Sequence, residues 1–133
     1  MTPMTALLAF AAWTLLLVAL VLAYRSVRIL SGTPADAWTR GKPSIDPGFV
    51  VRLTHAHLNC LENLPIFAVI VLVAGAQDKL PVIGALAAWV FYARVVQSCV
   101  HLVGVNPLLV TVRGTFWIIQ IVLFAVMFAR LFG

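Results

Sequence analysis

Apolar residues fall into four long runs, separated by short polar breaks. A helix needs roughly 20 mostly apolar residues to cross a hydrocarbon core about 30 Å thick. The first run has no charged residue between Leu7 and Tyr24, and each of the others is long enough for one crossing. The pattern predicts membrane-spanning helices at about residues 4–30, 47–74, 81–103 and 107–131.

The breaks between these runs predict how the helices are connected. Only residues 31–46 form a substantial polar loop, rich in glycine, proline and charged residues, as turns are. Asp46 and Pro47 are typical of a helix N-cap followed by proline in the first turn. The other connections are short, which favours antiparallel neighbours. We therefore expect an all-α membrane protein, with residues 1–133 forming a single antiparallel bundle of four transmembrane helices.

Composition excludes a water-soluble globule. Hydrophobic residues make up 63% of the chain and charged residues 10%, whereas soluble domains carry about 25% charged residues. The net charge of +5 does not indicate nucleic-acid binding, because the basic residues are scattered at helix ends. Cys60 and Cys99 both fall in predicted spans and lack metal-ligand spacing, so no metal site is expected.

The distribution of lysine and arginine predicts the orientation in the membrane. Loops carrying more of these residues usually lie in the cytoplasm. One end of the bundle would carry Arg25, Arg28, Arg40, Lys42, Arg52 and Arg113. The other end would carry Lys79 and Arg130. We expect the loop at 31–46 to be cytoplasmic and both termini to lie on the opposite side.

The second predicted helix carries a polar stripe. At about 100° per residue, its polar positions fall within a sector of roughly 100°. They are Arg52, His55, Asn59, Glu62 and Asn63. Ionisable groups at membrane depth cost about 2.5–3.5 kcal/mol each, so they usually face a bundle interior and pair. We expect an ion pair between Glu62 and Arg94 of the third helix.

Further polar residues mark the third and fourth helices. The third carries Arg94, Gln97, Ser98 and His101, and the fourth carries Arg113, Trp117 and Gln120 on similar faces. These groups have either a ligand-binding role or a purely structural one, holding helices together. Arg113 has no acidic partner on its own helix, which favours either a lipid-phosphate anchor or an anion-binding group.

The second helix resembles the signature of the MAPEG family, the membrane-associated proteins in eicosanoid and glutathione metabolism. That signature is an arginine, then Arg-Ala or a variant, then Asn-x-x-Glu and soon a proline. Arg52, Ala56, Asn59, Glu62 and Pro65 match it in identity and spacing. Arg94 matches another family position, and length, helix number and loop agree, so the resemblance covers nearly the whole chain.

The resemblance implies a homotrimer that binds glutathione as co-substrate between subunits, near the cytoplasmic face. Helices 1 and 2 of one subunit and helices 3 and 4 of its neighbour would hold it. Arg113 fits the family arginine that stabilises the thiolate, and is the expected catalytic residue. The expected glutathione-binding residues are Arg52, His55, Asn59, Glu62, Arg94, Gln97 and His101. A bacterial-type member would reside in the inner membrane, among its lipids.

The implied activity is a glutathione-dependent transferase or peroxidase acting on lipophilic electrophiles or lipid hydroperoxides. The chain departs from the family pattern at His55, where a second arginine is common, and at Asn63, Gln97 and His101, where tyrosines are common. These departures keep an alternative open: a non-catalytic protein on the same scaffold that binds a lipid or another anionic ligand. A small multidrug exporter is disfavoured, because the first helix has no acidic residue.

Overall fold

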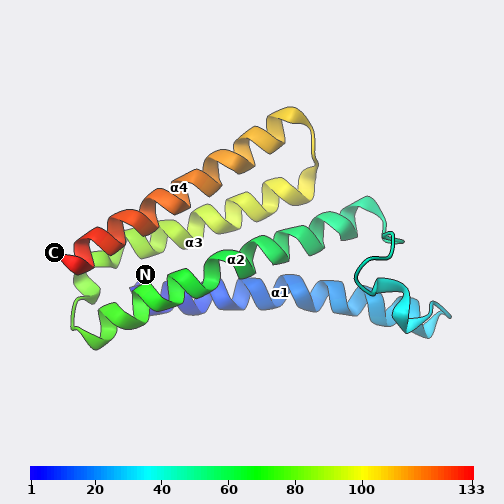
Figure 1. Cartoon of the computed structure of the whole chain (residues 1–133), viewed down its shortest axis with the longest axis horizontal. Coiled ribbons are helices and arrows are strands. Elements are labelled where there is room, and N and C mark those ends of the chain that lie inside the picture. The colour runs from blue at the N-terminus through cyan, green and yellow to red at the C-terminus, as the bar shows by residue number, and fades with distance from the viewer.

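Four long helices make up nearly the whole chain (Figure 1). The structure, a computed structural model, describes residues 1–133. Its elements are α1 (Pro3–Leu30), the short 3-10 helix η1 (Ala35–Trp38), α2 (Gly48–Ala76), α3 (Leu80–Val103) and α4 (Pro107–Phe132). Each α-helix is long and apolar enough to cross a membrane. The predicted four-helix membrane fold is confirmed, and the helix ends lie within two residues of the expected positions.

The helices run side by side with alternating direction, so the bundle has two distinct ends (Figure 1). Both chain termini and the α2–α3 turn lie at one end. The loop after α1 and the α3–α4 turn lie at the other, which we call the loop end. Helices α1 and α2 form one pair and α3 and α4 another, and the two pairs diverge toward the loop end.

The helix starts follow their local sequences, with one exception. The Thr2 side chain accepts from the Thr5 N–H at the start of α1, and Asn106 does the same for Leu109 at the start of α4. The expected N-cap at Asp46 is wrong. Pro47 precedes α2 without a side-chain cap, while Asp46 Oδ1 instead accepts from Trp38 Nε1 at 2.8 Å.

The apolar core lies toward the end that holds the termini. Phe67 of α2 packs between Phe10 of α1 and Phe124 of α4, with ring centroids 5.6 and 6.1 Å away. Large apolar side chains also cover the outside, as Leu15 and Trp89 do. That exterior suits lipid tails and not water. The buried polar side chains are Thr14, Asn63, Arg94, Gln97, Ser98, His101 and Gln120. The polar stripe predicted on α2 faces the interior only in part, because Asn63 is buried whereas His55 and Glu62 are exposed in the single chain.

Candidate functional site

A polar cavity of about 270 Å³ opens where α2, α3 and α4 meet. Its lining residues are Asn59, Glu62, Gln97, Arg113, Gly114 and Trp117. Four of these six were expected from the sequence to be site residues. The structure brings them together from three helices of a single chain, and we call this space the polar cavity.

The α2 wall of the polar cavity follows from helical spacing. Asn59 and Glu62 are three residues apart, so their side chains share one face of the helix. Glu62 lies midway along α2 and is exposed in the single chain. The Asn59 amide Nδ2 lies 3.4 Å from His101 Nδ1. His101 is buried and does not itself line the cavity.

The α3 wall depends on a buried pair of glutamines. Gln97 is 3% exposed, and its Oε1 accepts from Gln120 Nε2 at 2.8 Å. The same Gln120 nitrogen also donates to the Phe116 carbonyl one turn earlier in α4, at 3.0 Å, and this bond orients the Gln120 side chain. With its oxygen held by Gln120, the Gln97 amide keeps its own N–H groups for the cavity.

Glu62 and Arg113 place opposite charges on one cavity without pairing to each other. The ion pairs within 4.0 Å are Arg25–Asp46 and Lys42–Asp36, both near the loop. The Glu62 carboxylate and the Arg113 guanidinium are therefore both available to a ligand. A molecule that carries a cationic group and an anionic group suits such a pair.

The structure does not form the expected ion pair between Glu62 and Arg94. Arg94 is fully buried, and its guanidinium lies 5.6 Å from the centroid of the Phe10 ring in α1. None of its three nitrogen atoms has a hydrogen-bond partner. A cation over an aromatic face is attracted to it. Arg94 therefore lies against α1 in the bundle interior and does not line the polar cavity.

Arg52 and His55 lie nearer the loop end than the polar cavity. Arg52 Nε donates to the Leu102 carbonyl at 3.0 Å, in the last turn of α3, where cations favour the negative end of the helix dipole. His55 is exposed, and its ring centroid is 6.0 Å from that of His101. His55 lines a different cavity, formed with the loop.

The polar cavity also contains residues not expected in the site. Trp117 lies one turn after Arg113 on the same face of α4, and this shared face could have predicted that it lines the cavity. Nothing in the sequence indicated that Gly114 lines the cavity. A Cβ built on it meets no atom within 4 Å, so the missing side chain leaves open space. Asn63, next to Glu62 in sequence, is buried and does not line the cavity.

The fold and the polar cavity define the class of protein, which is an integral membrane four-helix bundle with a polar cavity between its helices. A profile of the MAPEG family matches residues 3–133, essentially the whole chain. The chain therefore belongs to the MAPEG family, as its second helix indicated. No curated protein and no solved structure matches it.

Proposed function

We propose that this protein is a membrane-embedded, glutathione-dependent transferase or peroxidase acting on lipophilic electrophiles or lipid hydroperoxides. The observation that carries the proposal is the unpaired Glu62 and Arg113 on one cavity, in a chain of the MAPEG family. Glutathione has an ammonium group, two carboxylates and a thiol. Its charges complement those that the polar cavity leaves free.

The binding mode follows from the groups on each wall. Glu62 accepts from the ammonium group of glutathione, while the amides of Asn59 and Gln97 bond its peptide groups. The glycine carboxylate points toward the loop end, where Arg52 lies in the first turns of α2. His55 lines the separate cavity formed with the loop and takes no part in this mode. Arg94 has no direct role in this mode, because it is fully buried against Phe10.

Arg113 supports the chemistry by stabilising the thiolate form of glutathione. In the transferase reaction the thiolate attacks an electrophilic carbon, a carbon–sulfur bond forms, and the leaving group departs with the bonding electron pair. In the peroxidase reaction the thiolate attacks the hydroperoxide and breaks the oxygen–oxygen bond. That step gives an alcohol and a sulfenic acid, which a second glutathione converts to a disulfide and water.

A separate apolar cavity between α3 and α4 suits a lipophilic second substrate. It has a volume of about 280 Å³, and α3 and α4 supply its lining. All its lining residues are hydrophobic: Trp89, Tyr92, Ala93, Val96, Phe116, Ile119 and Leu123. Val96 and Phe116 are the sequence neighbours of Gln97 and Trp117 in the polar cavity. A lipophilic electrophile would reach the thiolate sideways from the bilayer.

The exposure of Glu62 supports assembly into a homotrimer. A charged group exposed to lipid at the middle of a span costs about 2.5–3.5 kcal/mol. A neighbouring subunit and bound glutathione together would cover it. The lysine and arginine distribution supports placing the loop end in the cytoplasm of a bacterial cell, with the protein in the inner membrane.

The test compares Arg113→Ala with the wild type in detergent or nanodiscs. We expect wild type to bind glutathione by calorimetry and to conjugate it to chlorodinitrobenzene. Arg113→Ala should lower kcat by about 10²–10³-fold, as loss of one oxyanion-stabilising donor does. Arg28→Ala, which removes an exposed cation that lines neither cavity, is the control. Absence of binding and conjugation in wild type, with no effect of Arg113→Ala, would contradict the proposal.

One observation favours a second candidate, a non-catalytic protein that binds a lipid or another anionic ligand. The polar cavity has no hydroxyl among its lining side chains. An enzyme would then rely on Arg113 alone to activate the thiol. Mass spectrometry of co-purified small molecules separates the two candidates, because a bound lipid without any thiol compound would favour the second.

A further inference from the structure

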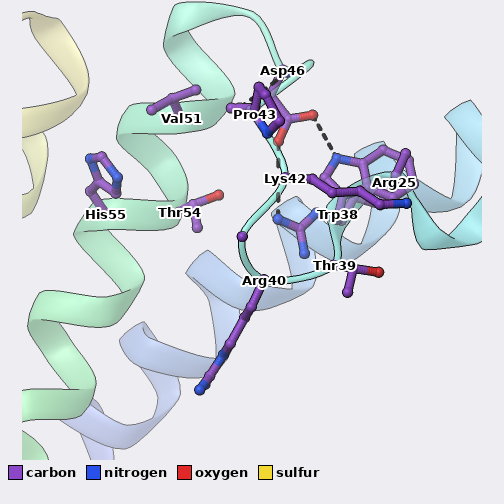
Figure 2. A pocket seen from close by; sticks show the side chains of 13 residues that line it. Arg25, Trp38, Thr39, Arg40, Lys42, Pro43, Asp46, Val51, Thr54 and His55 are labelled. Carbon is purple, nitrogen blue, oxygen red and sulfur yellow. Dashed lines mark hydrogen bonds and ion pairs between the residues drawn. The ribbon is translucent and has the colours of Figure 1, made fainter.

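A third cavity, of about 400 Å³, lies at the loop end and shares no residue with the polar cavity. The end of α1, the loop and the first turns of α2 enclose it. Figure 2 shows Val51, Thr54 and His55 on the α2 side, with Trp38 and Asp46 across from them. We call this space the loop pocket.

The charges around the loop pocket are mainly positive. Arg25, Arg40 and Lys42 line it together with a single acid, Asp46. The Asp46 side chain is 4% exposed and is already engaged: it accepts from Trp38 Nε1 at 2.8 Å and lies 4.0 Å from Arg25 Nη2. Lys42 pairs with Asp36, which does not line the pocket. Arg40 is therefore the lining cation without an acidic partner, and the lining carries an excess of positive charge.

Several donors at the loop pocket have no acceptor within the chain. Arg25 Nε is buried without a hydrogen-bond partner. Arg25 is held in place by Trp38, whose ring centroid lies 5.5 Å from the guanidinium carbon. Arg40 forms no ion pair, and the backbone N–H groups of Arg40 and Gly41 take no part in backbone hydrogen bonds. Arg40 and Gly41 are exposed, so water can accept from their donors, whereas a buried donor without an acceptor, such as Arg25 Nε, is rare and indicates a missing partner.

We propose that the loop pocket binds a phosphate group. Arginine guanidinium groups match the oxygens of phosphate in planar geometry, and lysine adds a point charge. A phosphate has several oxygens, so it can accept from Arg25, Arg40 and Lys42 at once. The pocket lies at the loop end of the bundle, between the end of α1 and the first turns of α2, and phospholipid headgroups are expected near such helix ends. The group therefore comes either from an anionic phospholipid or from a soluble phosphate ester.

This proposal does not depend on glutathione. The polar cavity offers one cation and one carboxylate for a ligand of mixed charge. The loop pocket is lined by three cations and one acid, and one of those cations, Arg40, has no acidic partner. The two sites should therefore bind independently, and a variant at one should leave the other unchanged.

The experiment uses the full chain and two probes. In nanodiscs of mixed phosphatidylcholine and phosphatidylglycerol, native mass spectrometry counts the retained phosphatidylglycerol. In a phosphate-free detergent, phosphorus NMR line broadening reports binding of inorganic phosphate. The test variant is Arg40→Gln/Lys42→Gln, whose positions are both exposed, so the fold should persist. The control is Arg28→Gln, an exposed cation on the same end of α1 that does not line the pocket.

We expect the double variant to bind at least one probe about ten-fold more weakly, because two charge-assisted hydrogen bonds are lost, while Arg28→Gln binds as wild type does. Loss of lipid binding alone would assign the phosphate to a headgroup. Loss of inorganic phosphate binding alone would assign it to a soluble ester. The proposal is wrong if wild type binds neither probe, if Arg28→Gln weakens binding equally, or if glutathione displaces the probe.

Discussion

At the residue scale, the polar cavity depends on side chains that do not touch its interior. Gln120 does not line the cavity, yet it holds the oxygen of Gln97, which does. His101 contacts the other amide through its nitrogen, because Asn59 Nδ2 lies 3.4 Å from His101 Nδ1. These two contacts orient the amides of Gln97 and Asn59 at the cavity wall. Substitution of Gln120 or His101 should therefore affect both stability and ligand binding.

Gln120→Leu should destabilise the protein by about 1–3 kcal/mol, because it leaves the buried oxygen of Gln97 without a partner. The double variant Gln97→Leu/Gln120→Leu should recover most of that loss, since no unpaired oxygen remains. Unfolding in mixed micelles measures both. If the double variant were as unstable as the sum of the two single variants, the hydrogen bond would have no coupling role.

Gly114→Leu should block ligand binding without disturbing the fold. A Cβ at Gly114 meets no atom within 4 Å, so a larger side chain extends into the cavity. We expect the KM for glutathione to rise, while Gly114→Ala stabilises α4 by up to about 1 kcal/mol. Gly84→Leu is the matched control, because Gly84 is also helical with open space around it but lies far from the cavity. Equal effects of the two leucine variants would contradict the assignment.

Sequence periodicity predicted the site residues within one helix better than it predicted contacts between helices. Asn59 and Glu62 share a face because of their spacing, and both line the cavity. Arg94 and Gln97 have the same spacing, yet Gln97 contacts α4 while Arg94 lies against Phe10 of α1. Because the two helix pairs diverge, residues on one face of α3 contact different helices at different points along its length. A single sequence contains no direct signal for that divergence.

At the element scale, the helix ends were predictable and the loop was not. Apolar runs of membrane length fixed the four helices, with proline and glycine marking their ends. The role of Asp46 was missed because its partner Trp38 lies in a turn, η1, that has no periodic pattern. The contact between Arg52 and Leu102 was missed for a similar reason, since it joins residues far apart in the sequence.

Arg52→Met should loosen the loop end of α3. The variant keeps a long stem but removes the Nε donor to the Leu102 carbonyl. We expect faster hydrogen exchange over residues 101–106, with the rest of α3 unchanged. Arg28→Met, at an exposed position of α1, is the control. Unchanged exchange in Arg52→Met would show that this contact does not hold the helix end, and would leave Arg52 free for a ligand.

At the scale of the whole molecule, the proposed homotrimer can be compared with the polar cavity of the single chain. The family resemblance implies glutathione held by helices 1 and 2 of one subunit and helices 3 and 4 of the next. In the structure Glu62 and Arg113 line one cavity of a single chain. Because Glu62 is exposed there, a neighbouring subunit is expected to cover the cavity and not to supply its charges.

Mixed assemblies test this arrangement. We expect the purified protein to be trimeric in detergent by analytical ultracentrifugation. Glu62→Gln and Arg113→Ala subunits, carrying different tags, are then co-expressed and the mixed trimers are isolated. If each site takes Glu62 and Arg113 from the same chain, every site in a mixed trimer lacks one of them, so glutathione conjugation should stay as low as in the single variants. If the two residues came from neighbouring chains, some sites would hold both and activity would recover. Recovery would therefore assign the polar cavity to the interface, while its absence, with normal trimers, would assign it to the single chain.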